Sequence, residues 1–63
     1  MKLKLAEWRR ARNISQEEMA KSLGIAKPTY VRWEKRPELI PINSAFKIAE
    51  IFEVEITNIL FLP

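Results

Sequence analysis

Two cations and two small apolar residues share one side of the segment Lys27–Lys35 if that segment is helical. At about 100 degrees per residue, Val31 lies about 40 degrees from Lys27 around the helix axis. Pro28 and Arg32 follow at about 100 and 140 degrees. In the DNA major groove, guanine offers the acceptors O6 and N7 to Lys or Arg, and thymine offers a methyl group to apolar side chains. This side of the segment therefore matches the edges of base pairs.

The opposite side of the same segment carries two large aromatic residues. Tyr30 and Trp33 fall at about 300 and 240 degrees from Lys27, which places them together on a face suited to a hydrophobic core. Their burial is expected to anchor the helix by several kcal/mol in total. The alternative for the basic side is an ordinary solvated face, because single exposed apolar residues are common.

The segments before and after Lys27–Lys35 predict how this helix is held. Ser15 and Glu18 have the spacing of a capping box, in which each residue bonds the other's backbone N–H, and Gly24 supplies the left-handed turn that ends such a helix. Pro28 fits the first turn of the next helix, and Pro37 ends it. A helix-turn-helix over about residues 16–36 is the result, with the second helix entering the groove and the first crossing the DNA backbone.

The rest of the chain predicts three more helices around this unit. The first covers about residues 2–12 and ends at Asn13, which tolerates a left-handed backbone. Asn43 or Ser44 caps the fourth, and a short fifth covers about residues 56–60. The expected fold is all-α, a compact five-helix domain covering residues 1–63.

Composition narrows the possible functions. The chain of 63 residues has no Cys and no His, so a disulfide framework and a zinc or haem site are not expected. No apolar run reaches membrane-spanning length and no signal-like segment opens the chain. The adjacent Glu17 and Glu18 are explained by helix capping rather than by catalysis. We expect no enzyme activity, no cofactor, no membrane contact and a cytoplasmic location.

Charge is divided unevenly along the chain. Residues 1–36 contain ten Lys or Arg and four Glu, a balance of +6. Residues 37–63 contain one Lys and four Glu, a balance of −3. This segregation favours a polyanionic partner for the first half, although a solvated surface with uneven charge is the simpler alternative.

The sequence resembles the lambda-repressor-like helix-turn-helix family of the Cro/CI type. The resemblance covers about residues 5–62 and rests on Arg9 and on the stretches 14–20, 23–25, 30–34, 48–49 and 52–54. It implies a five-helix domain with a recognition helix at about Lys27–Lys35, sequence-specific binding to an operator, and usually dimers on near-palindromic sites.

Carried over residue by residue, the resemblance implies three groups of site residues. The DNA base contacts it implies are Lys27, Pro28, Val31 and Arg32. The phosphate contacts are Gln16, Thr29, Lys35 and Arg36, and for Thr29 a base contact is the alternative. It also implies a structural ion pair between the two neighbouring helices, made by Arg9 and Glu34, and this pair is not a DNA contact.

Three positions depart from the family pattern. Ala26 stands where a Ser or Thr usually caps the recognition helix. Pro28 cannot make the amide-type contact to a base that the family often uses at that position. Glu53 replaces the usual glycine after the fourth helix, so a strained or differently shaped turn is expected there.

The favoured reading is a small Cro-like repressor of a phage or mobile element, acting on double-stranded DNA in the bacterial cytoplasm, on the nucleoid when bound. We expect a homodimer and no small-molecule ligand. The alternative is a protein-binding module of the same fold, of the antitoxin or anti-repressor type. An apolar surface suited to a dimer or to such a partner is expected at Leu39, Ile40, Ile42, Phe61 and Leu62.

Overall fold

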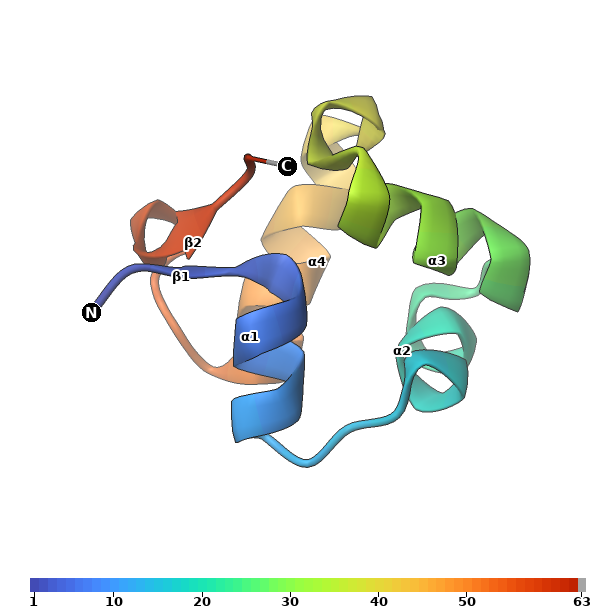
Figure 1. The fold of residues 1–63 in the computed structure, drawn as a ribbon, viewed down its shortest axis with the longest axis horizontal. Helices are drawn as coiled ribbons and strands as arrows, with labels where there is room; N and C mark the ends of the chain where they lie inside the picture. The colour runs from blue at the N-terminus through green and yellow to red at the C-terminus, as the bar shows by residue number, and fades with distance from the viewer. Residues whose placement is uncertain (63) are drawn as a thin grey trace.

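Four α-helices, two 3-10 turns and one pair of short strands make up the fold (Figure 1). The computed structural model describes residues 1–62, and the predicted domain end at Pro63 lies outside them. In chain order the elements are β1 Leu3–Lys4, α1 Leu5–Ala11, α2 Gln16–Leu23, α3 Lys27–Lys35, η1 Pro37–Leu39, α4 Ile42–Phe52, η2 Ile56–Asn58 and β2 Ile59–Leu60.

The predicted fifth helix is wrong. Residues 56–60 form the single turn η2 and then the strand β2, which pairs in parallel with β1. Leu3 lies opposite Ile59 and Lys4 opposite Leu60, so the two ends of the chain meet in a two-stranded sheet (Figure 1). The fold is therefore mostly helical with four α-helices, and a small sheet replaces part of the expected fifth helix.

The first helix is shorter than the predicted range 2–12. Leu3 and Lys4 are extended because they belong to β1. The backbone N–H of Lys4 donates to Glu7 Oε1 at 2.7 Å, which satisfies a group that the first turn of α1 leaves free. At the other end of α1, Asn13 has φ 57°, the left-handed conformation that the sequence predicted.

The predicted signals around α2 and α3 are present. Ser15 Oγ accepts from the backbone N–H of Glu18 at 3.0 Å, and the backbone N–H of Ser15 donates to Glu18 Oε1 at 2.9 Å. Gly24 ends α2 with φ 69°, a conformation that costs a residue with a Cβ about 1 kcal/mol or more. Ala26 gives α3 no side-chain cap, but its carbonyl accepts from the N–H of Thr29 at 3.1 Å.

Helix α4 begins at Ile42, so both predicted caps, Asn43 and Ser44, are wrong and lie inside the helix. Pro41 precedes it with φ −62° and ψ 149°, and the Pro41 carbonyl accepts from the N–H of Ala45 at 3.0 Å. Asn43 therefore lies within the first turn instead of capping it. The helix ends at Glu53 with φ 58°, so this glutamate adopts the left-handed turn for which glycine is better suited.

All four helices and β2 contribute side chains to one core. The buried hydrophobic residues are Leu5, Trp8, Met19, Ala20, Tyr30, Trp33, Ala45, Ile48, Ala49, Phe52 and Ile59. Trp8 also ties α1 to the C-terminal segment, because its indole N–H donates to the Asn58 carbonyl at 2.8 Å. Arg12 Nε donates to the Phe52 carbonyl at 2.7 Å, and its guanidinium lies 5.2 Å from the centre of the Trp8 ring. Within residues 1–62, no helix is long and apolar enough to cross a membrane.

Candidate nucleic-acid interface

The outer side of α3 presents cations to solvent. Lys27, Arg32 and Lys35 are exposed, as is Pro28, and none of the three cations forms an ion pair within residues 1–62. Val31 is half-buried between this side and the core side. Three of the predicted base-contact residues, Lys27, Pro28 and Arg32, therefore lie exposed on one side of one helix, and Val31 lies at its edge, partly covered by the protein.

The predicted phosphate contacts at the ends of α3 differ in how free they are. Thr29 is half-buried in the first turn. Arg36 follows the last turn, and its Nε donates to Glu38 Oε2 at 3.1 Å in a pair whose members are both exposed. Such an exposed pair contributes little stability, so Arg36 is able to exchange Glu38 for another anion at small cost.

The inner side of α3 fixes the helix to the rest of the protein. Tyr30 is fully buried and Trp33 nearly so, both within the core cluster. Full burial of an aromatic side chain contributes about 2 to 3 kcal/mol from apolar area alone. Helix α3 is thus held from behind while its cationic side stays in solvent.

Arg9 and Glu34, the two residues that the resemblance paired, join α1 to α3. Arg9 Nε donates to Glu34 Oε2 at 2.6 Å, and Arg9 Nη1 donates to the Ile14 carbonyl at 2.9 Å. Only 12% of the Arg9 side chain and 8% of the Glu34 side chain are exposed. A pair so little exposed is costly to break, because either charge alone would be left buried without its counterion.

Gln16 completes this network instead of pointing only to solvent. Its amide nitrogen donates to Glu34 Oε1 at 2.9 Å, so both Glu34 oxygens are bonded. The sequence assigned Gln16 to a phosphate and missed this bond, although helix geometry held a signal. Glu34 lies at about 340 degrees from Lys27, between the aromatic side and the basic side, where it is able to reach the start of α2.

The network also sets the ionisation of two groups. Burial by itself would raise the pKa of Glu34, but the hydrogen bonds from Arg9 and Gln16, with the nearby Arg9 charge and Tyr30 hydroxyl, outweigh it and hold the pKa below the usual 4.5. Burial, with the Glu34 carboxylate beside it, raises the pKa of Tyr30. The Tyr30 hydroxyl has no partner of good hydrogen-bond geometry within residues 1–62, so Arg9 and Gln16 supply the well-formed bonds to Glu34.

The residues predicted as a dimer surface do not all share one exposed patch. Leu39, Ile42 and Leu62 are exposed, whereas Ile40 and Phe61 are half-buried and pack against the core. The sequence missed Phe46, which is 52% exposed and follows the 65% exposed Ile42 by four residues on α4. That spacing is the signal, because residues four apart lie on the same side of a helix.

Residues 1–62 contain no cluster of three or more Asp, Glu, His or Cys side chains that could hold a metal ion.

Comparison with known proteins shows which chains have a similar sequence. A family model described as "Helix-turn-helix" matches residues 5–59. An uncharacterized HTH-type transcriptional regulator of Methanocaldococcus jannaschii is 41% identical over 59 residues, covering 94% of this chain and 89% of that protein. Two such regulators of Archaeoglobus fulgidus are 36% and 32% identical over 59 residues, covering 94% of this chain and 83% and 84% of theirs. No solved structure is detectably similar.

Proposed function

The chain belongs to the lambda-repressor-type helix-turn-helix family, and on this premise we propose that it binds double-stranded DNA in a sequence-specific way to regulate transcription. One observation carries the proposal. Within residues 1–62, Lys27 and Arg32 are exposed and form no ion pair, on the outer side of a helix whose inner side is buried. The names of the relatives, which are HTH-type transcriptional regulators, support it.

In this proposal α3 enters the major groove and α2 lies across the DNA backbone. Lys27 and Arg32 donate to guanine O6 and N7, and Val31 contacts a thymine methyl group, with Pro28 packing against a base edge. Thr29, Lys35 and Arg36 contact phosphates. No step of catalysis is part of the proposed function.

Gln16 has a double role in the proposal. Its amide nitrogen has two hydrogens, and one of them is directed at Glu34. The second hydrogen, together with the free backbone N–H groups in the first turn of α2, is suited to a phosphate oxygen. A Gln16 held by Glu34 is a preorganised phosphate contact, because less side-chain freedom is lost when DNA binds.

We further propose that the protein acts as a small Cro-like repressor and binds a near-palindromic operator as a homodimer. Two-fold symmetry in such a complex is mirrored in the two half-sites of the DNA. The exposed Leu39 and Ile42 near the C-terminal end of α3 are the surface we assign to the dimer.

Selection of preferred sequences from a random DNA pool, at a stated salt concentration, tests the proposal. We expect one enriched, near-palindromic motif, and binding to it that weakens steeply as salt rises, because phosphate contacts release counterions. The alternative, a protein-binding module, predicts no enriched motif. Absence of any motif would overturn the proposed function.

Two substitutions then separate base reading from phosphate contact. Arg32→Ala should weaken binding by about 1 to 3 kcal/mol at one base pair and relax the preference there. Gln16→Ala should weaken binding to all sequences alike. Lys2→Ala is the matched control, because Lys2 is an exposed cation next to the N-terminus. Figure 1 shows the N-terminus on the opposite side of the view from α3. Equal loss on every sequence for Arg32→Ala would refute its base-reading role.

A further inference from the structure

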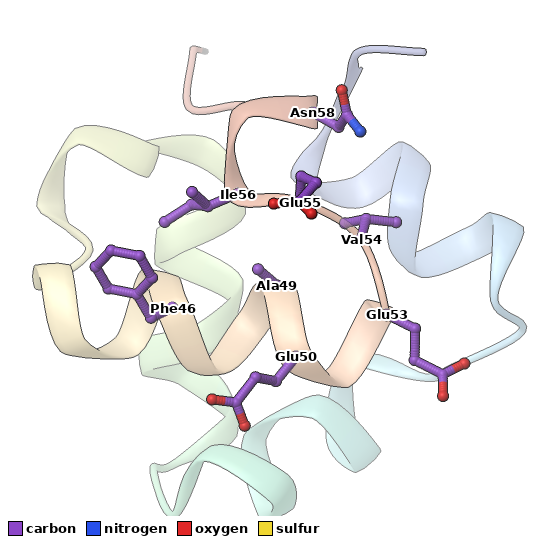
Figure 2. Close-up of a pocket in the computed structure, with 8 residues that line it drawn as sticks. All are labelled: Phe46, Ala49, Glu50, Glu53, Val54, Glu55, Ile56 and Asn58. Atoms are coloured by element: carbon purple, nitrogen blue, oxygen red, sulfur yellow. The ribbon is translucent and has the colours of Figure 1, made fainter.

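A depression opens between α4 and the segment that follows it, and the DNA-binding proposal makes no use of it. It has a volume of about 610 Å³ and is lined by residues of α4, η2 and the connection between them (Figure 2). Four of the lining residues are apolar: Phe46, Ala49, Val54 and Ile56. Phe46 is 52% exposed although it is a large aromatic residue. Exposed apolar surface in a hollow is characteristic of a site that contacts another molecule.

Three acidic residues are among those that line this depression: Glu50, Glu53 and Glu55. In Figure 2 the Glu55 side chain lies beside Ile56, whereas the exposed carboxylates of Glu50 and Glu53 point outward from α4. The protein has eight acidic side chains, and four of them accept hydrogen bonds from other residues, namely Glu7, Glu18, Glu34 and Glu38. Of the four acidic side chains that accept none within residues 1–62, three are these carboxylates. These three negative charges lie within six residues of the chain and form no ion pair with any residue that the structure describes.

None of the residues that line the depression belongs to α2 or α3, the helices that carry the proposed DNA contacts up to Lys35. Figure 2 looks into it from the side on which α4 stands in front of α3. The three acidic residues would repel DNA phosphates, so this surface stays free when α3 occupies a groove. The net charge of −3 for residues 37–63, in a protein of net charge +3, is explained by this local concentration.

We propose that the depression, lined by Phe46 and Ile56 and flanked by the acidic residues Glu50, Glu53 and Glu55, binds a basic segment of another protein that also carries one or more apolar side chains. Phe46 and Ile56 contact an aliphatic or aromatic side chain of that segment. The three carboxylates pair with its Lys or Arg residues, which neutralises like charges that now have no partner. The proposal does not depend on DNA binding, because none of these residues belongs to the basic side of α3.

A displayed library of random peptides about twelve residues long, selected against the full chain at physiological salt, tests this assignment. We expect enriched peptides that combine Lys or Arg with Leu, Ile or Phe. Each of the two substitutions Phe46→Ser and Glu55→Gln should weaken an enriched peptide by about tenfold or more, which corresponds to about 1.4 kcal/mol. The matched control is Glu17→Gln, which removes an exposed, unpartnered carboxylate on α2 and should change affinity by less than about twofold.

Three results would overturn the proposal: no enrichment of basic peptides with apolar residues, equal weakening by the control, or binding that is lost merely by raising salt and is insensitive to Phe46→Ser. Sedimentation of the free protein adds a fourth. If Phe46→Ser abolishes self-association of the protein, a second copy occupies the depression instead. Phe46 and Glu55 are both exposed, so Phe46→Ser and Glu55→Gln are expected to fold. Circular dichroism tests whether they do. DNA binding by these variants should be unchanged, which separates this test from that of the proposed function.

Discussion

The two sides of α3 differ in whether their polar groups have partners inside the protein. On the inner side, both oxygens of Glu34 are bonded, by Arg9 and by Gln16, next to the buried Trp33. On the outer side, Lys27 and Arg32 are exposed and form no ion pair within residues 1–62. One helix of nine residues therefore separates buried, bonded groups from exposed cations by helical period, and under the proposed function this division separates stability from recognition. Substitutions on the inner side should change folding, and substitutions on the outer side should change binding.

The largest effect is expected where the inner side is most apolar. Trp33→Ala should lower the free energy of unfolding by about 3 to 5 kcal/mol, because it removes a buried indole and leaves a cavity. For a small domain this is a large share of the total stability. Arg32→Ala, one residue away on the outer side, should change it by less than about 0.5 kcal/mol. Urea unfolding followed by circular dichroism measures both, and similar losses would erase the distinction between the two sides.

The second-largest loss of stability is expected from the ion pair between Arg9 and Glu34. Arg9→Met should destabilise the fold by about 3 kcal/mol, because Glu34 would be left buried with a charge that only Gln16 and Tyr30 face. Arg10→Met is the matched control, since Arg10 is the next residue on α1 and is exposed. We expect the control to stay near wild type in thermal unfolding.

A double substitution tests whether this loss arises from the pair. With both Arg9→Met and Glu34→Gln, no buried charge is left alone, so the double variant should be more stable than the sum of the two single losses predicts. Strict additivity would mean that Arg9 stabilises the fold through its bond to the Ile14 carbonyl and not through Glu34.

Lowering the pH should reduce the contribution that Glu34, on the inner side, makes to the free energy of unfolding. The folded-state pKa of Glu34 is lowered, so its contribution to stability is present above pH of about 4.5 and is lost as pH falls through the folded-state value. The measurement is unfolding free energy against pH for wild type and Glu34→Gln. Glu18 and Glu38 also have lowered pKa values, but they are present in both proteins. The difference between the two curves should shrink toward low pH, and a constant difference would contradict the assignment.

From the sequence we predicted the features of α2 and α3 that depend on interactions between residues close in the chain. The capping box at Ser15, the left-handed turn at Gly24 and the proline in the first turn of α3 act within a few residues, so they located both helices. The helical period alone separated Tyr30 and Trp33 from Lys27 and Arg32. Both predictions use only residues 15–37.

The parts that the sequence missed depend on contacts between distant segments. Leu3–Lys4 and Ile59–Leu60 are too short to show an alternating pattern, and they are extended because they pair with each other across the whole chain. The predicted start of α4 was wrong because Asn43 is a residue type that often caps helices, whereas the cap position is occupied by Pro41, which makes no side-chain cap hydrogen bond. The bond from Gln16 to Glu34 required knowing how α2 and α3 cross.

The smallest effect should come from the residue that stands between the two sides. Val31 is half-buried, so Val31→Ala should lower the free energy of unfolding by about 1 kcal/mol or less, well below the loss at Trp33. On DNA, the same variant should lose preference for thymine at one position while its binding to other sequences stays close to wild type, because the lost contact is apolar and carries no charge. Unfolding in urea measures the change in stability. Binding to two DNA sites that differ only at that base pair measures the change in base preference. A large loss of stability without a change in base preference would move Val31 wholly to the inner side, and the recognition surface would then consist of Lys27, Pro28 and Arg32 alone.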